Sequence, residues 1–365
     1  MVKVQLKDIS KFYGSRRGVE DLNLTIEDGE YLAVLGPTGS GKTTTMYLVS
    51  GLLKPSSGAI LFDDEDVSEV EAEDRNVGFV FEEYNLFSRM TVESNVLFGP
   101  IVKDLNLHES RVIARELFTL LNISGKEQNY PDEISGGQKQ RVALARAIVS
   151  NAHLLVMDDP LRALDAKIRE MLQIELRNLV KDLGITCIHA THDTHEAMRV
   201  ADRIAVFKEG KIEQIGTPEE VYNNPISLYV ANFLGESSTI EGKVERKKKD
   251  VFLVHENGTK LKIETDLQDG KEVIALVPSE LVDVYHISEK DVLNYDNIIK
   301  ATILNSKCIG EFYEIDLLVN GISIKAKELI GKDIPLEKNS EVLIATDKDD
   351  YRIFQKIRSK RNVHK

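Results

Sequence analysis

The feature that constrains the fold of this 365-residue chain most strongly is a short glycine-rich segment, residues 36–43, which reads GPTGSGKT. It follows the apolar run YLAVL at residues 31–35, typical of a strand, and precedes a run with helical periodicity at residues 44–50. Glycines between a strand and a helix let successive backbone N–H groups turn inward around phosphate oxygens, and the helix N-terminus adds positive potential. The pattern predicts an α/β sheet with a phosphate-binding loop.

This segment, called the phosphate loop below, predicts binding of a nucleoside triphosphate. Lys42 is expected to reach the β- and γ-phosphates, and Thr43 to offer its hydroxyl to Mg²⁺. Asp158 follows the apolar run at residues 154–157 and is expected beside the loop as a second Mg²⁺ ligand; alternatively, Asp158 and Asp159 only cap the next turn. The expected nucleotide-binding residues here are Gly36, Pro37, Thr38, Gly39, Ser40, Gly41, Lys42, Thr43 and Thr44.

The composition of the chain limits which kinds of partner it can bind. The chain has 47 basic and 60 acidic residues, a formal net charge of -13, which repels nucleic acid phosphates. The one dense basic run, residues 246–249, is interpreted as the exposed face of a hairpin. No apolar stretch approaches the roughly 20 residues that span a bilayer, so we expect a soluble chain that docks onto another protein's helices if it serves a membrane.

The chain is expected to form two domains. Up to about residue 235, short apolar runs alternate with helical periodicity, which is typical of parallel strands joined by crossover helices. Beyond it, turn signals at residues 256–258, 268–270 and 319–321 separate short strands, which predicts a small all-β, partly open barrel. The expected strands are residues 31–35, 77–81, 154–157, 186–190, 251–254, 273–277, 313–319 and 341–345, and one helix is expected over residues 168–183.

Residues 134–141, ISGGQKQR, resemble the signature sequence of ATP-binding-cassette (ABC) ATPases. Ser135 is suited to cap the helix that follows, and Gly136 and Gly137 can expose backbone N–H groups to an anion. The resemblance implies that Ser135, Gly136, Gly137 and Gln138 face the γ-phosphate held by a second subunit. The alternative is an ordinary capped helix.

The resemblance extends along most of the chain and implies three further roles. Tyr13 matches the aromatic residue that stacks on adenine, although a buried aromatic side chain is the alternative. His192 matches the switch histidine that contacts the γ-phosphate and orients the attacking water. Asp165 matches an aspartate that bridges the two subunits. Residues 210–222 and the β-rich extension resemble importer subunits that carry a C-terminal regulatory domain.

Three positions depart from the family pattern. Asp159 stands where the family has the glutamate that polarises the attacking water, and its carboxylate is expected to lie roughly 1 Å too far back. Glu82 stands where a glutamine senses Mg²⁺; as a carboxylate it can still ligate the metal. Arg162 stands where a serine is usual, and it could reach a phosphate or carboxylate across the dimer. We expect slow ATP hydrolysis, with a nucleotide-dependent regulator as the alternative.

The fold class implied by this resemblance is an α/β P-loop NTPase of ABC type, with a mixed sheet and a helical subdomain, followed by an all-β OB-like barrel. The implied domains are residues 1–235, nucleotide-binding with a helical subdomain at about 88–150, and residues 236–365, regulatory and of TOBE/MOP type. A groove after Glu82, with Phe87 and Met90, is expected to receive a helix of a membrane subunit.

The implied cofactors are ATP and Mg²⁺. The implied partners are a second copy or a close paralogue, integral membrane permease subunits and, through them, an extracytoplasmic solute-binding protein, with no nucleic acid. The expected location is peripheral, on the cytoplasmic face of the cell membrane. Sugar is the expected solute, with polyamine, iron or oxyanion as alternatives. An ATP-driven clamp on DNA or ribosomes is disfavoured, because the chain has neither a coiled-coil insertion nor a second cassette.

Overall fold

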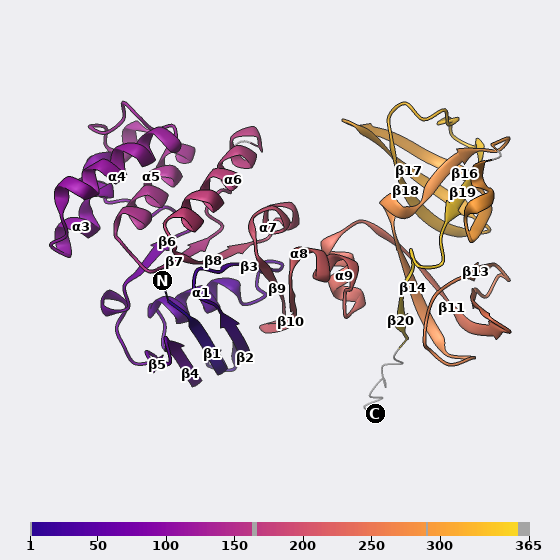
Figure 1. Ribbon diagram of the computed structural model, residues 1–365, viewed down its shortest axis with the longest axis horizontal. Helices are drawn as coiled ribbons and strands as arrows, with labels where there is room; N and C mark the ends of the chain where they lie inside the picture. The colour runs from indigo at the N-terminus through magenta and orange to yellow at the C-terminus, as the bar shows by residue number, and fades with distance from the viewer. Residues whose placement is uncertain (1, 163–165, 290, 357–365) are drawn as a thin grey trace. The chain divides into compact units, whose positions relative to one another are not determined.

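The computed structural model describes residues 2–162, 166–289 and 291–356. The chain divides into two compact units, Met1–Val221 and Tyr222–Lys365. The first unit is α/β. The second consists of β-strands apart from short helical segments, including helix α9 near its start, which confirms the predicted fold class (Figure 1).

A six-stranded sheet forms the centre of the first unit, in the order β10-β9-β3-β8-β7-β6. Its five strands from β9 to β6 are parallel, and β10 pairs with β9 antiparallel. The apolar runs that predicted β3, β7 and β8 are buried on both faces, as is usual for parallel sheets covered by helices. The run that predicted β6 is half-buried, and β9 and β10 were not predicted. The strands are β3 Tyr31–Leu35, β6 Val77–Val80, β7 Leu154–Asp158, β8 Thr186–Thr191, β9 Arg203–Lys208 and β10 Lys211–Gly216.

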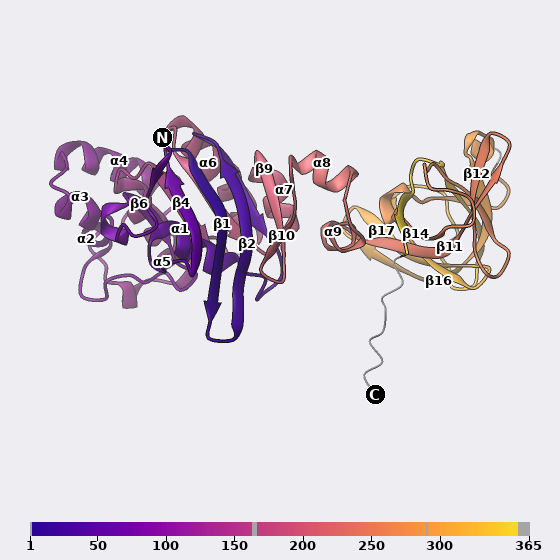
Figure 2. The same cartoon turned by 90° about the horizontal axis from the view of Figure 1, so that it is seen from below.

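A second sheet of the first unit is antiparallel and was not anticipated by the sequence analysis. Its order is β2-β1-β4-β5, with bounds β1 Val4–Tyr13, β2 Arg16–Ile26, β4 Ser57–Phe62 and β5 Glu65–Asp66. Figure 2 shows β1 and β2 as a long hairpin. The hairpin places Tyr13 and Arg16 at its turn.

Helices surround the six-stranded sheet. Figure 1 shows α3, α4 and α5 grouped at one end of the first unit. In the predicted helix at residues 168–183, Leu172 and Leu176 are buried as expected, but Leu183 is 46% exposed because it lies beyond the end of α6. The helices of the chain are α1 Lys42–Ser50, α2 Val92–Val96, α3 Phe98–Val102, α4 Leu107–Leu120, α5 Gly136–Val149, α6 Ala166–Asp182, α7 Thr194–Val200, α8 Pro218–Asn223 and α9 Leu228–Leu234.

None of the helices in the described parts of the chain is long and apolar enough to cross a membrane. Short 3-10 helices complete the regular helical structure: Ala72–Asp74, Pro131–Glu133, Ser279–Leu281 and Asp291–Asn294.

The second unit contains two five-stranded antiparallel sheets around one apolar core. Their orders are β13-β12-β11-β14-β20 and β15-β19-β16-β17-β18. The basic run at residues 246–249 lies at the exposed β11–β12 hairpin, as predicted. The strands are β11 Ser237–Lys247, β12 Asp250–Val254, β13 Lys260–Lys262, β14 Glu272–Pro278, β15 Asp283–His286, β16 Asn297–Ile309, β17 Phe312–Val319, β18 Ile322–Leu329, β19 Glu341–Thr346 and β20 Arg352–Gln355.

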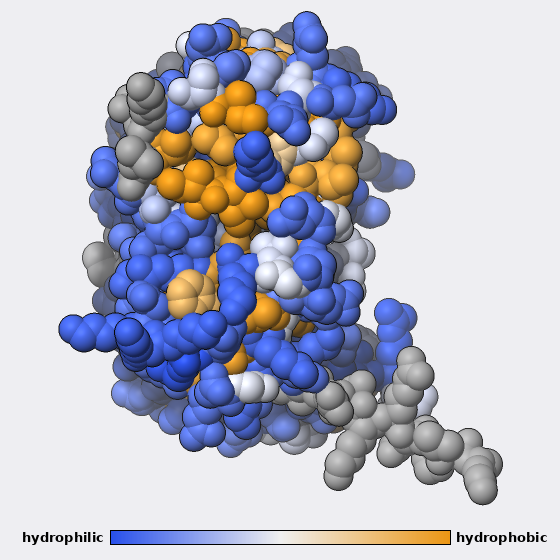
Figure 3. Space-filling model, turned by 90° about the vertical axis from the view of Figure 1, so that its right-hand side faces the viewer, coloured by the Kyte–Doolittle hydropathy of each residue, from blue (hydrophilic) through white to orange (hydrophobic). Residues whose placement is uncertain are grey.

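Apolar side chains are also present on the surface of the second unit. Figure 3 shows them gathered on the face turned toward the viewer. Exposed apolar residues of this unit include Ile298 and Leu304 on β16 and Leu318 on β17, which pairs with β16. Some strand positions of the second unit therefore leave apolar surface outside its core.

Candidate functional site

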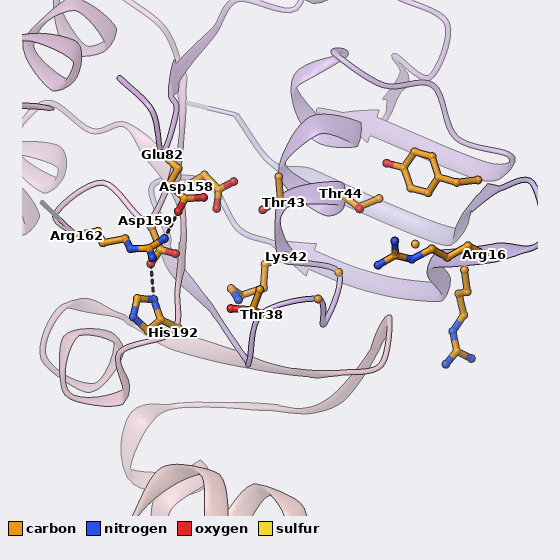
Figure 4. Close-up of a pocket in the computed structure, with 15 residues that line it drawn as sticks. Arg16, Thr38, Lys42, Thr43, Thr44, Glu82, Asp158, Asp159, Arg162 and His192 are labelled. Atoms are coloured by element: carbon orange, nitrogen blue, oxygen red, sulfur yellow. Dashed lines mark hydrogen bonds and ion pairs between the residues drawn. The ribbon is translucent and has the colours of Figure 1, made fainter. Parts of the chain in front are cut away.

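A pocket of about 490 Å³ opens where β3, β7 and β8 end and α1 begins. Because the carboxyl ends of parallel strands meet at one edge of a sheet, residues far apart in sequence converge there. Figure 4 shows their side chains around this space. The lining residues are Tyr13, Arg16, Arg17, Gly18, Thr38, Gly39, Gly41, Lys42, Thr43, Thr44, Glu82, Asp158, Asp159, Arg162 and His192.

The phosphate loop has the backbone conformation that its glycines predict. Gly39 and Gly41 have φ of 82° and 105°, in the left-handed region that side chains disfavour. A Cβ on Gly36 would lie 2.7 Å from Ser40 Oγ and 2.8 Å from the Phe207 carbonyl oxygen, so only glycine fits there. Gly41 caps α1 without a side-chain hydrogen bond, which leaves the first N–H groups of the helix available to an anion.

Lys42 lies inside the loop. Its Nζ donates hydrogen bonds to the carbonyl oxygens of Gly36, at 2.7 Å, and Pro37, at 3.1 Å. Burial lowers the pKa of Lys42, and the carboxylates of Asp159, Asp158 and Glu82 oppose that shift. The ammonium group is therefore held at the loop by contacts that phosphate oxygens can replace.

Asp158 is the last residue of β7 and is 4% exposed. Burial raises the pKa of Asp158, while a hydrogen bond with Thr43 lowers it and the charges of Asp159 and Glu82 raise it. Thr43, Asp158 and Glu82 supply the oxygen donors that Mg²⁺ prefers. Within the described residues, no three His, Cys, Asp or Glu side chains converge into a metal cluster. The oxygen donors of Thr43, Asp158 and Glu82 would fit a metal ion whose remaining ligands come from phosphate and water.

Asp159 contacts His192 across the pocket. His192 Nδ1 lies 3.0 Å from Asp159 Oδ1 (Figure 4). Asp159 has φ of 45°, a left-handed conformation that aspartate tolerates better than most residues. Its backbone N–H donates to the Ala190 carbonyl at 2.9 Å, and Gln140 Nε2 donates to its carbonyl at 3.2 Å. Asp158 and Asp159 thus each contact another side chain of the pocket, Thr43 and His192 respectively.

Glu82 and Arg162 form an ion pair within the same chain (Figure 4). The Arg162 N–H donates to the Asp159 carbonyl at 3.3 Å, so a tight turn returns Arg162 to the pocket. The sequence left open whether Arg162 meets a phosphate or a carboxylate. In this structure its partner is the carboxylate of Glu82.

Tyr13 lies at the end of β1, lines the pocket and is 48% exposed. The alternative of a buried aromatic side chain is therefore wrong. A Cβ on Gly18 would lie 2.8 Å from Tyr13 Cε2, so glycine makes room for the ring. Sequence reasoning missed Arg16 and Arg17, which line the same pocket; the signal available was their position directly after the Tyr13-Gly14-Ser15 turn.

The signature segment begins α5 but does not line this pocket among the residues described. Ser135 Oγ accepts a hydrogen bond from the Gln138 N–H at 3.3 Å, and Gln138 Oε1 accepts one from the Ser135 N–H at 2.9 Å. This reciprocal pair is a capping box. Gly136 is exposed beside it. Asp165 lies outside the described residues.

Similarity to known proteins agrees with this geometry. Residues 19–162 match the family model described as ABC transporter. The chain is 38% identical over 338 residues to the spermidine/putrescine import ATP-binding protein PotA of Haemophilus influenzae strain Rd, covering 91% of this chain and 90% of that protein. It is 40% identical over 342 residues to the sulfate/thiosulfate import ATP-binding protein CysA of Brucella melitensis, covering 92% and 90%.

A solved structure supports the fold of the first unit. The dimeric post-hydrolysis state of the ATP-binding cassette MJ0796, bound to ADP and Pi, matches with a TM-score of 0.55 and 31% identity. The match covers 59% of this chain and 98% of that one.

The phosphate loop, the acidic end of β7 and the capped signature helix together define an ATPase of the P-loop class. Since relatives at this identity span nine-tenths of the chain, the protein belongs to the ABC transporter family, whose ATP-binding subunits are ATPases.

Proposed function

We propose that this chain is the ATP-hydrolysing subunit of an ABC importer for a small charged solute. The observation that carries the proposal is the pocket that gathers the phosphate loop, Asp158, Asp159 and His192 at one sheet edge. The names of the relatives, both import ATP-binding proteins, support the importer role.

In this proposal each side chain of the pocket has a separate task. Lys42 binds the β- and γ-phosphates, while Thr43, Asp158 and Glu82 hold Mg²⁺. Asp159 acts as the base toward the attacking water, and its contact with His192 orients both groups. Tyr13 stacks on the adenine ring. Mg²⁺, when bound, neutralises negative charge that develops on the phosphates.

A second copy of the chain would complete the site. Ser135, Gly136, Gly137 and Gln138 form the capped start of α5, which does not line the pocket of its own chain. A helix start of this kind is suited to bind an anion. We infer that this segment faces the nucleotide of the partner and that Asp165 lies near that interface. Closure on ATP and opening after hydrolysis then couple the nucleotide to permease subunits, with residues 1–235 as the motor domain and 236–365 as the regulatory domain.

The solute we propose is a polyamine or a sulfate-like oxyanion. Relatives that span nine-tenths of the chain are named for spermidine/putrescine and for sulfate/thiosulfate, whereas sugar was the expectation from the sequence. Such importers use permease subunits and, in this proposal, an extracytoplasmic binding protein. The chain would lie on the cytoplasmic face of the membrane.

The proposal is tested with the chain expressed together with its membrane partners. The wild-type complex should release phosphate from Mg-ATP and take up labelled spermidine or sulfate, and Lys42→Ala should do neither. Nucleotide binding without any phosphate release, even in a single turnover with the partners present, would instead favour the nucleotide-dependent regulator that Asp159 suggests.

A further inference from the structure

The pocket contains three carboxylates at the place where phosphates are proposed to bind. All three carboxylates, Asp158, Asp159 and Glu82, line the pocket together with Lys42. Burial lowers the pKa of Lys42, and the charges of these carboxylates act against that shift. Three negative charges beside a triphosphate would weaken nucleotide binding. The carboxylate of Asp159 contacts His192, and that of Asp158 forms a hydrogen bond with Thr43. The carboxylate of Glu82 forms an ion pair with Arg162.

We propose that Arg162 is a positioning residue for Glu82: by pairing with its carboxylate, Arg162 limits how strongly Glu82 can engage Mg²⁺ and so sets the Mg²⁺ dependence of nucleotide binding. This inference rests on the proposed function. Arg162 can perform this task because the turn that begins at Asp159 returns its guanidinium to the pocket.

The exposure of the pair makes it adjustable. The Arg162 and Glu82 side chains are 60% and 44% exposed, so water and salt screen their attraction and either group can exchange partners. In a buried pair, separating the two groups would leave a desolvated charge without a partner, which is costly, so the pair would not exchange partners. Competition between Arg162 and the metal for the same carboxylate is therefore feasible in this pocket.

The test measures a binding ratio instead of hydrolysis. The affinity for ADP is determined by calorimetry with excess Mg²⁺ and again with a chelator, and the tightening by Mg²⁺ is compared among wild type, Arg162→Ser, Glu82→Gln and the double variant. Freeing Glu82 in Arg162→Ser should raise this tightening about 3- to 10-fold. In the Glu82→Gln background the same change should leave it within about twofold, because the residue through which Arg162 acts is gone.

Two controls separate this role from a general charge effect. Arg162→Lys keeps the cation and should stay close to wild type. Lys54→Ser removes the same charge from exposed ion pairs with Glu69 and Glu71 outside the pocket and should leave the ratio unchanged. The inference is overturned if Arg162→Ser changes the ratio equally with and without Glu82, or in neither background. A wild-type chain that binds no nucleotide would instead reject the proposed function.

Discussion

The contact with His192 positions the side chain of Asp159, which is one methylene shorter than the glutamate of the family pattern. Its Oδ1 lies 3.0 Å from the imidazole Nδ1, while the backbone is held by Ala190 and Gln140. These contacts fix the orientation of the carboxylate. The side chain remains one methylene shorter than that of glutamate. If Asp159 is the base, as proposed, its shorter reach should slow hydrolysis.

Replacing Asp159 tests that account directly. Asp159→Glu should raise kcat for ATP, by up to about 100-fold, because the carboxylate regains roughly 1 Å of reach. Asp159→Asn removes the base and should lower kcat by about 10²- to 10⁴-fold with little change in ADP affinity. Steady-state phosphate release measures both. A rate for Asp159→Glu that equals or falls below wild type would show that reach is not the limiting factor.

Most of the pocket could be predicted from sequence, because the phosphate loop and the ends of β7 and β8 are local patterns placed together by a parallel sheet. Arg16 and Arg17 were missed, because they come from an antiparallel hairpin and the signal available, their place directly after a turn, is much weaker than a phosphate-loop motif. The pairing of Glu82 with Arg162 could not be predicted from the sequence either. The two residues are far apart in the chain, and each was noticed only as an isolated departure.

At the scale of elements, α5 combines two tasks at its first turn. Ser135 caps the helix through Gln138, and the proposed function also assigns that end to a partner's γ-phosphate. The two tasks respond differently to charge, because a carboxylate caps a helix well but repels phosphate.

Two substitutions at Ser135 separate these tasks. Ser135→Asp should keep the free energy of unfolding within about 0.5 kcal/mol of wild type, because aspartate is as good a cap as serine, yet abolish ATP hydrolysis. Ser135→Ala should lower the free energy of unfolding by about 1 kcal/mol. Chemical denaturation and phosphate release are the measurements. Full activity in Ser135→Asp would mean that this helix end does not meet the nucleotide.

A buried histidine links β8 to β3 and α7. His189 is fully buried, its Nδ1 lies 3.0 Å from the Tyr31 hydroxyl, and its Nε2 lies 3.7 Å from Glu196 Oε1. Burial lowers the pKa of His189, against the opposing charges of Glu196 and Asp159. The histidine is therefore neutral in the folded first unit near pH 7.

This burial predicts a loss of stability in mild acid. The unfolded chain takes up the His189 proton near pH 6.5 and the folded chain only at lower pH, so stability falls as the pH falls below about 6.5. The slope should reach about 1.4 kcal/mol per pH unit. Thermal unfolding at several pH values should show a smaller slope for His189→Gln, whereas the exposed His108→Gln should behave as wild type. Equal slopes in all three proteins would contradict the assignment.

The elements themselves were predicted unevenly. Strands with unbroken apolar runs, such as β3 and β8, were located almost to the residue because burial on both faces leaves a strong signal. The sheet formed by β1, β2, β4 and β5 was missed, since half-exposed strands mix polar and apolar positions. In the second unit, β16 was not predicted for the same reason, because its exposed apolar and polar residues alternate irregularly.

On the scale of the whole molecule, each unit has its own apolar core. The core of the second unit is built from residues between Ile240 and Tyr351, and those of the first unit use residues before Val221. Independent cores predict independent unfolding.

Calorimetry of the whole chain should therefore show two unfolding transitions. Mg-ADP at about 100 times its Kd should stabilise the first unit by about 2.7 kcal/mol and leave the transition of the second unit in place. The separate fragment 222–356 should reproduce the unshifted transition. A single transition that moves as a whole with ADP would show that the two units unfold together.

The claim on which the mechanism depends is that each nucleotide is bound by two copies of the chain. Lys42→Ala removes the phosphate contact of one half of the shared site, and Ser135→Asp disables the other half. Neither variant alone should hydrolyse ATP, but an equimolar mixture should regain about a quarter of the wild-type rate, since about half of the dimers are mixed and each carries one intact site. A mixture as inactive as the separate variants would contradict a site shared between two copies.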